Sequence, residues 1–372
     1  MPEIWFKYGS TDIVLDIRFE NLLKHVSSAY PSLTEDEIKS SLKDVMLGNN
    51  TLIIALSGSR SVAKIITILF EISRSKGCEK LTVDVLPNIQ NTLKSYIADT
   101  KIPLEPIGYL SLDERIHKFE NILFVSHVTY DPLFGFSGTP TQVLHNFMKD
   151  KMSEVFKSRQ SNLPSAGIKG NSLDIAISYC ENIPAATIEL VADYHAIAGI
   201  YYGNIVESFN NAIKRLNDVS ISRTEMAKSA IISMSREILP HLTLANSLNS
   251  LWNLSHVVKE GGSLVLLAEN KQGIGGGALQ MFIEGNLKMQ EARVSSSYID
   301  GLEHIIFIEE LKQKYELGIL STIPQYYLKT LLGFTTYSST KQILQDLLAK
   351  HGKNNKILAV SDADSILLKT VS

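Results

Sequence analysis

Residues 51–86 read TLIIALSGSRSVAKIITILFEISRSKGCEKLTVDVL, and this stretch decides the fold class. Thr51–Leu56 is a continuous apolar run, typical of a strand that is buried on both faces. After a polar turn, Val62–Lys76 predicts a helix, which ends at Gly77. Leu81–Leu86 predicts a second strand. A strand, a helix and a strand in this order predict a β-α-β unit, the building block of a parallel sheet.

The same alternation continues on both sides of this unit. Before it, Ile4–Phe6 and Ile13–Ile17 are joined by a polar turn and predict a hairpin. After it, apolar runs predict strands at Ile122–Val125, Ala186–Ala192 and Ala196–Gly203. Helices are predicted at Gln142–Ser158, Leu173–Glu181 and Asn204–Leu216.

A polar, serine-rich stretch, Asp218–Glu225, is the predicted domain boundary. Beyond it the pattern predicts strands at Ser229–Met234, Leu264–Ala268, Glu316–Ser321 and Lys356–Val360. It predicts helices at Leu244–Val258, Ala278–Arg293, Gln325–Leu332 and Thr340–His351. We therefore expect two α/β domains, residues 1–222 and 223–372, each with a mainly parallel sheet flanked by helices, and a cleft between them.

The charge and hydropathy of the chain limit the kinds of partner that we expect. The chain has 372 residues, a formal net charge of −3 and no run of basic residues, so nucleic acid is not an expected partner. The apolar runs are too short for a membrane span, and the N-terminus lacks a signal-peptide pattern. Cys78 and Cys180 fit reduced core thiols. The sequence predicts a cytoplasmic protein that acts on a small-molecule anion; assembly into a homo-oligomer is left open.

The turn Ser57-Gly58-Ser59-Arg60 is the first candidate site, because it follows a buried strand and opens a helix. Ligands of open α/β sheets bind at the carboxyl ends of the strands. Ser57 and Ser59 can supply hydroxyls beside a helix N-terminus, and Arg60 can clamp a carboxylate or phosphate. The alternative is a helix-capping turn with a solvated arginine.

The loop Gly135-Phe136-Ser137-Gly138-Thr139-Pro140-Thr141 is the second candidate. Its glycines allow close approach of a ligand to the backbone, yet the loop contains no Lys, Arg or His. His127 and Asp131 precede it and His145 follows it, so these three side chains are candidate acids and bases. The alternative is that each is a structural group with a local partner.

The order of these motifs resembles the nickel-pincer lactate racemase family. The resemblance rests on the two candidate motifs together with Gly170-Asn171-Ser172, Ala198-Gly199-Ile200-Tyr201-Tyr202-Gly203-Asn204 and Lys259-Glu260-Gly261-Gly262-Ser263. It extends over nearly the whole chain, and Gly-Phe-Ser-Gly is its most specific part. It implies a site in a cleft between two α/β domains. There a pyridinium mononucleotide that carries nickel is tethered to a lysine, and two histidines exchange the proton of a 2-hydroxy acid.

The resemblance also implies roles for particular positions. Arg60 would hold the substrate, and Gly135, Phe136, Ser137, Gly138 and Thr141 would form the cofactor loop. Thr141 stands where the tethering lysine is expected, and Asp131 where one catalytic histidine is expected. Pro87-Asn88-Ile89-Gln90 replaces the turn that holds the other histidine. Asn249 stands near the place of a substrate-side lysine, and no nickel-binding histidine is evident near Glu154–Gln160.

Two functions follow from these observations. The first is an isomerase-type enzyme that acts on a small 2-hydroxy acid or related anion with an altered centre, using His127, Asp131 or His145 for proton transfer and Arg60 as the clamp. Covalent attachment of a nickel cofactor is not expected, because threonine lacks the amine. The second is a non-catalytic binding or scaffold protein that keeps the cleft for a nucleotide or carboxylate ligand. The enzyme hypothesis predicts that Arg60, His127 and Asp131 converge.

Overall fold

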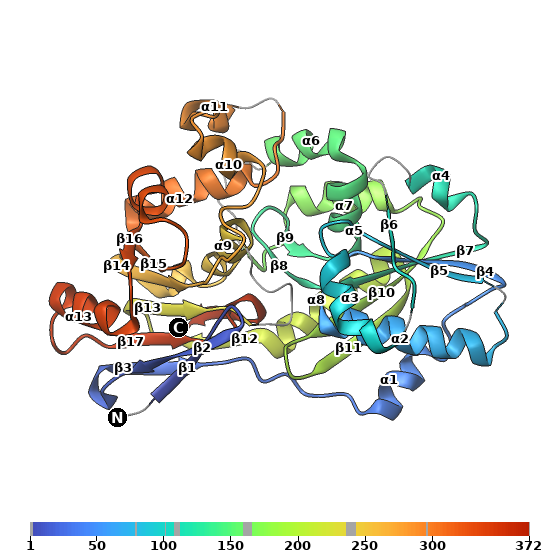
Figure 1. The fold of residues 1–372 in the computed structure, drawn as a ribbon, viewed down its shortest axis with the longest axis horizontal. Helices are drawn as coiled ribbons and strands as arrows, with labels where there is room; N and C mark the ends of the chain where they lie inside the picture. The colour runs from blue at the N-terminus through green and yellow to red at the C-terminus, as the bar shows by residue number, and fades with distance from the viewer. Residues whose placement is uncertain are drawn as a thin grey trace.

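The computed structural model describes residues 3–78, 80–100, 102–107, 112–158, 166–235, 243–294 and 297–371. It has two lobes, each built around a six-stranded sheet with helices on its faces (Figure 1). This arrangement confirms the predicted α/β class with two mainly parallel sheets. Both chain ends lie on the same lobe (Figure 1).

The first sheet has the strand order β11-β10-β7-β4-β5-β6. Its strands are β4 (Asn50–Ala55), β5 (Lys80–Val85), β6 (Glu105–Pro106), β7 (Asn121–His127), β10 (Ala186–Ala192) and β11 (Ile197–Asn204). All neighbours are parallel except β10 and β11. The helices of this lobe are α1 (Glu35–Leu42), α2 (Arg60–Ser75), α3 (Gln90–Ile97), α4 (Leu112–Ile116), α5 (Thr139–Phe147), α6 (Met152–Lys157), α7 (Asn171–Cys180) and α8 (Ile205–Ser220).

The second sheet has the order β16-β15-β14-β13-β17-β3, and all its neighbours are parallel. Its strands are β3 (Leu22–Val26), β13 (Ala227–Ser233), β14 (Val258–Leu267), β15 (Glu316–Leu320), β16 (Thr335–Tyr337) and β17 (Ile357–Val360). The helices beside it are α9 (Leu244–Trp252), α10 (Ala278–Ile283), α11 (Met289–Val294), α12 (Leu302–Lys314) and α13 (Thr340–His351).

The N-terminal segment packs with the second lobe, as a separate two-stranded sheet followed by strand β3 of the second sheet. The predicted hairpin forms, with β1 (Glu3–Tyr8) antiparallel to β2 (Thr11–Asp16). Its inward side chains Ile4, Phe6 and Leu15 share a buried apolar cluster with side chains of β13 and β14, and β3 pairs with β17. The division at residue 222 remains a prediction, but strands β1, β2 and β3, within residues 3–26, pack with the later half of the chain.

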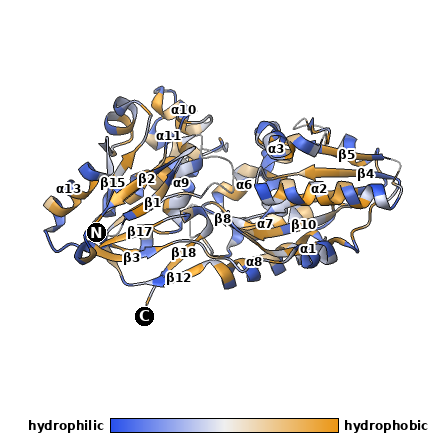
Figure 2. Ribbon diagram, turned by 60° about the horizontal axis from the view of Figure 1, so that its bottom comes forward, coloured by the Kyte–Doolittle hydropathy of each residue, from blue (hydrophilic) through white to orange (hydrophobic). Residues whose placement is uncertain are grey.

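Apolar strands dominate the interiors of both lobes, and the helices turn polar faces outward (Figure 2). In α2, Val62, Ile65, Ile66 and Leu69 are fully buried, at the three- and four-residue spacing of one helix face. Burial of such side chains contributes about 1.5–3 kcal/mol each. Within the described residues, no helix is long and apolar enough to cross a membrane.

Several predicted elements differ in the structure. Gln142–Ser158 is not one helix: α5 and α6 are separated by a 3₁₀ turn at Lys149–Lys151. Ala278–Arg293 is also two helices, because Gly285 adopts φ +77° between α10 and α11. Asp218–Glu225, the predicted domain boundary, holds the end of α8 and the strand β12 (Ile221–Thr224), which pairs with β18 (Leu367–Thr370).

Candidate functional site

A cavity of about 330 Å³ opens where the strand order of the first sheet reverses. The chain continues from β4 toward β5 on one side and from β7 toward β10 on the other, and the carboxyl ends of β4 and β7 meet at the cavity. Such a reversal is where open α/β sheets bind ligands. The second lobe supplies the opposite wall, with Ala245, Asn246 and Asn249 of α9 and the segment from Tyr298 to His304.

The side chains of the first candidate motif, residues 57–60, do not all face the same cavity. Ser57 lines the cavity, and its Oγ accepts a hydrogen bond of 3.1 Å from the backbone N–H of His127. Ser59 is fully buried and caps α2, since its Oγ accepts the N–H of Val62 at 3.1 Å. Arg60 does not line the cavity: its guanidinium lies 5.0 Å from the centre of the Tyr194 ring, in a separate hollow beside α1 and α3. The structure therefore does not bring Arg60 together with His127 and Asp131.

His127, at the end of β7, is a buried neutral group in the cavity wall. Its ring faces the backbone oxygen of Ala192, which lies 3.0 Å from Nε2. Burial lowers the pKa of His127 to about 4, although this hydrogen bond acts in the opposite direction. A neutral imidazole whose Nε2 donates to a carbonyl carries its lone pair on Nδ1. That atom has no hydrogen-bond partner.

Asp131 closes the hairpin of β8 (Thr129–Asp131) and β9 (Gly135–Ser137) and lines the same cavity. Its Oδ1 accepts the backbone N–H groups of Leu133 and Phe134, both at 2.7 Å. Burial raises the pKa of Asp131; the bond from Phe134 opposes this rise, and the negative charge of Glu303 adds to it. Asp131 is therefore both a turn-forming residue and a carboxylate at the cavity.

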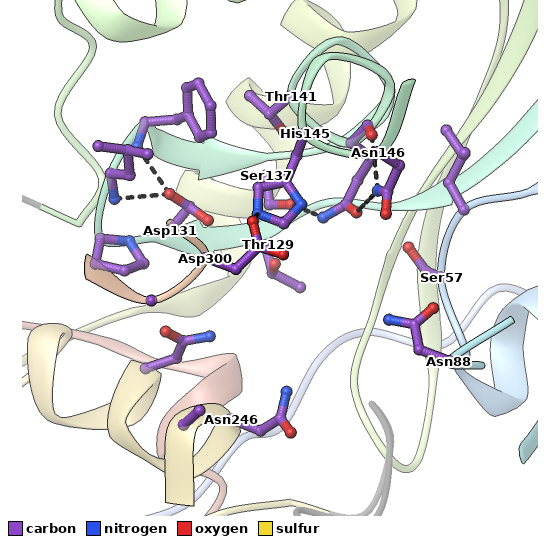
Figure 3. Close-up of a pocket in the computed structure, with 18 of the residues that line it drawn as sticks. Ser57, Asn88, Thr129, Asp131, Ser137, Thr141, His145, Asn146, Asn246 and Asp300 are labelled. Carbon is purple, nitrogen blue, oxygen red and sulfur yellow. Dashed lines mark hydrogen bonds and ion pairs between the residues drawn. The ribbon is translucent and has the colours of Figure 1, made fainter. Parts of the chain in front are cut away.

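His145 projects from α5 toward the second lobe. Its Nε2 lies 3.4 Å from Oδ1 of Asp300, and Lys149 Nζ lies 3.4 Å from the other oxygen of that carboxylate. Figure 3 shows His145 and Asp300 close to Asp131, whereas Ser57 and Asn88 lie at the other end of the cavity. The structure thus gathers His127, Asp131 and His145 around one cavity.

Contacts with neighbouring protein atoms explain the backbone conformation of the second candidate motif, the loop 135–141. Gly135 has φ +84°, and an added Cβ would lie 2.0 Å from the backbone oxygen of Ile168. Phe136 is buried against Tyr130, with ring centres 5.7 Å apart. A Cβ on Gly138 would lie 2.4 Å from the ring of Phe209. Both glycines are therefore required by neighbouring protein atoms.

Two further members of the loop, Ser137 and Thr141, line the cavity. Ser137 Oγ accepts a hydrogen bond of 2.7 Å from the amide of Gln142. Thr141 Oγ1 accepts the N–H of Gly138 and donates to the oxygen of the same residue, both at 3.0 Å. The hydroxyl of Thr141 thus holds the first turn of α5 in place.

The residues present do not fit a tethered nickel mononucleotide. Thr141 offers a hydroxyl that is already engaged with Gly138, where an amine would be needed. No Lys or Arg is found among the described residues that line the cavity, so nothing there matches a phosphate with positive charge. In the part of the chain that the structure describes, no three His, Cys, Asp or Glu side chains are grouped as metal ligands. Of the range Glu154–Gln160, in which no nickel-binding histidine is evident from the sequence, the last two residues lie outside the described residues.

Apart from Asn249, the sequence did not indicate which residues of the second lobe would line the cavity. Tyr298, Glu303 and His304 line the cavity, and the Tyr298 hydroxyl donates to Glu303 at 2.9 Å. Burial lowers the pKa of His304 to about 4, and its ring stacks on Trp252 at 5.6 Å. These residues carry no local motif, and only the meeting of the two lobes brings them to the site. The glycine-rich run before α10 contributes Gly276 to the wall.

Comparison with known proteins establishes the fold. No family model and no curated protein sequence matches the chain. The lactate racemase apoprotein from Thermoanaerobacterium thermosaccharolyticum has a similar structure, with a TM-score of 0.78 and 13% identity over 99% of this chain and 100% of that chain. A protein from Thermotoga maritima matches with a TM-score of 0.69 and 10% identity, over 92% of this chain and 100% of that one. The chain therefore has the fold of the lactate racemase apoprotein.

Proposed function

We propose that this protein binds a small polar molecule in the cavity between its lobes, on a lactate racemase fold but without a tethered nickel cofactor. The observation that carries the proposal is the place and lining of the cavity. It lies at the strand-order reversal of the first sheet, and polar side chains from both lobes surround it.

The residues that line the cavity also support the proposal that no cofactor is covalently attached there. The resemblance places a lysine at Thr141, histidines at Asp131 and near Asn88, and a substrate-side lysine near Asn249. All four of these residues line the cavity. A threonine cannot replace the amine of the tether, and an amide cannot act as an acid or base near neutral pH. The frame of the site is thus kept while its reactive groups differ.

A second candidate function is proton transfer on a bound 2-hydroxy acid or related molecule, an isomerase-type reaction. The position of Asp131 and His145 on one cavity favours this function. Burial raises the pKa of Asp131, and the nearby His145 opposes part of this rise. A carboxyl group with a raised pKa is a better base near neutral pH. Arg60 lines a different hollow and not this cavity, so it is not part of this second candidate function.

Intact mass and metal analysis test the absence of a tether. Protein made in a strain that builds the nickel cofactor is expected to have the mass of the bare chain, 41.3 kDa, and no stoichiometric nickel. A covalent mass increase with bound nickel would contradict the proposal.

A ligand-observed NMR screen tests the binding site. Asn246 lies on the exposed side of α9 and lines the cavity, so Asn246→Trp should fill it. Ser178→Trp, on an exposed position of α7 outside the cavity, is the matched control. We expect small polar fragments to bind the natural protein and the Ser178 variant but not the Asn246 variant. Equal binding to all three proteins, or to none, would refute the site.

Deuterium exchange tests the second candidate function, proton transfer. In D₂O, an enzyme of this type would exchange the proton at C2 of a hydroxy acid for deuterium, and both Asp131→Asn and His145→Gln would slow the exchange. Absence of exchange in the natural protein would leave the binding function and reject the second candidate.

A further inference from the structure

The cavity wall is acidic. Asp131, Asp300 and Glu303 line it, and no lysine or arginine does so in the described ranges. Burial lowers the pKa of both His127 and His304 to about 4, so neither ring brings a positive charge at neutral pH. Lys149 and His145 pair with Asp300, and His145 itself lines the cavity. An anionic ligand beside Asp131 would meet like charge, and no lysine or arginine of the described lining would compensate it.

The wall also presents hydrogen-bond acceptors that have no donor. Nδ1 of His127 is an acceptor, because Nε2 of the same neutral ring donates to Ala192. Oδ1 of Asn249, also an acceptor, has no partner, and neither has Nδ1 of His304, which can donate or accept according to the tautomer of that ring; both residues line the cavity. His127 and His304 are more than nine-tenths buried. Buried polar atoms normally have partners, so three unpartnered ones around one cavity indicate a site that a polar ligand completes.

Asp131 and Glu303 stand out among the acidic groups. Oδ1 of Asp131 is held by two backbone N–H groups, and no ion pair joins this carboxylate to a described cation. Oε2 of Glu303 accepts the hydroxyl of Tyr298. Asp131, Glu303 and His304 line the same cavity; the negative charge of Glu303 raises the pKa of Asp131, and that of Asp131 acts to raise the pKa of His304. These three side chains form one subsite, which we call the acidic subsite.

We infer that the ligand of this cavity is a small polyhydroxylated amine, with its ammonium group in the acidic subsite and its hydroxyl groups donating to the unpartnered acceptors of the wall. The inference rests on the proposed binding function and names its ligand class. A chain of six carbons with hydroxyl groups suits a cavity of about 330 Å³. Such a ligand is opposite in charge to a 2-hydroxy acid.

Three compounds with the same six-carbon chain separate charge from shape. D-gluconate is an anion, D-glucitol is neutral and D-glucamine is a cation at neutral pH. By isothermal titration calorimetry of the full chain, we expect D-glucamine to bind at least about 10-fold more tightly than D-gluconate, with D-glucitol between them. Added salt should weaken the binding of D-glucamine more than that of D-glucitol.

Two variants connect this preference to the acidic subsite. Asp131→Asn keeps an oxygen for the N–H groups of Leu133 and Phe134 but removes the charge. It should weaken D-glucamine binding about 10-fold and leave D-glucitol nearly unchanged. Glu303→Gln should act in the same direction, and it provides the test if the Asp131 variant does not fold. Asp150→Asn, an exposed acid paired with Lys151 outside the cavity, should change nothing.

The outcomes distinguish this inference from the proposed function. Tighter binding of D-gluconate than of D-glucamine would overturn the ligand class while the cavity remained a binding site. A further outcome is that none of the three compounds binds, while small polar fragments bind the natural protein but not Asn246→Trp. That result would also overturn the ligand class and leave the cavity as a binding site. An unchanged preference in both acidic-subsite variants would also overturn the inference. If no fragment binds at all, the proposed function itself fails.

Discussion

Glu189 shows how a single side chain can set the pH dependence of the fold. It is fully buried on β10, its Oε1 accepts the N–H of Thr139 at 2.9 Å, and its Oε2 has no partner. Burial raises the pKa of Glu189 to about 7 from 4.5, although the hydrogen bonds with Thr139 oppose the rise. The folded state therefore prefers the protonated carboxyl, and ionisation at higher pH weakens it.

The first prediction follows from this shift. Because the folded pKa is raised, the stability that Glu189 gives is fully present below about pH 4.5 and is lost as the pH rises through about 7. Glu189→Gln cannot ionise, so its free energy of unfolding should rise relative to the natural protein over this window, by about 3 kcal/mol in total. Denaturant unfolding at pH 5 and pH 8.5 measures the difference. The exposed Glu71→Gln on α2 is the control and should show no such change.

The second prediction concerns Gly135. Its φ of +84° is unfavourable for other residues, and an added Cβ would collide with the oxygen of Ile168. Gly135→Ala should lower the free energy of unfolding by at least about 2 kcal/mol. Gly170, the N-cap of α7, has φ −156° and open space at its Cβ position, so Gly170→Ala should lower the free energy of unfolding by only about 0.5–1 kcal/mol. Equal effects in thermal unfolding would show that the loop does not need its glycine.

Sequence reasoning was least reliable for the roles of single residues. It predicted that Ser59 and Arg60 would face the site, but Ser59 caps α2 and Arg60 stacks on Tyr194. The pattern of a strand, a polar turn and a helix is the same for both roles, and the direction of each side chain depends on the neighbouring helix. His304 had no signal at all, because Trp252 and the opposite lobe create its surroundings.

At the scale of helices and strands, long periodic segments were predictable. Strand β10 and helix α13 have the predicted bounds, Ala186–Ala192 and Thr340–His351, since buried runs and regular apolar spacing mark them. The three-residue strands β8 and β9 were not predicted, because so few residues show no alternation. The break between α5 and α6 was missed for a related reason: no glycine or proline marks it.

The third prediction concerns the start of α8. Asn204 is the last residue of β11, and its side chain accepts the N–H groups of Val206 and Glu207 at 2.9 and 3.2 Å. Asn204→Ala removes this cap and should cost about 1 kcal/mol of stability. Asn204→Asp retains an acceptor at the positive end of the helix and should restore most of the loss. Equal melting temperatures for the alanine and aspartate variants would contradict the capping role.

At the scale of the molecule, the cavity depends on contact between the lobes. The sequence predicted a cleft between two domains but not the residues that join them. The segment around Tyr298 reaches from the second lobe to α5 and α6. The backbone N–H of Tyr298 donates to Ser153 at 2.9 Å, and its ring lies 5.8 Å from that of Phe156 and 6.2 Å from that of His145. Residues about 150 positions apart in the chain thus close one side of the site.

The fourth prediction tests whether this contact holds the cavity together. Tyr298→Ala removes the ring contacts with Phe156 and His145 and the hydroxyl that binds Glu303. Hydrogen exchange in α6 and in residues 297–304 should become at least about 10-fold faster, because local opening no longer breaks these contacts. Tyr326→Ala is the control, since that ring is 62% exposed and is paired only with Tyr327 among the described rings. If the Tyr298 variant exchanges no faster than the control, the lobes are held by other contacts. The cavity would then keep its shape without the Tyr298 segment, and ligand binding in this variant should match that of the natural protein.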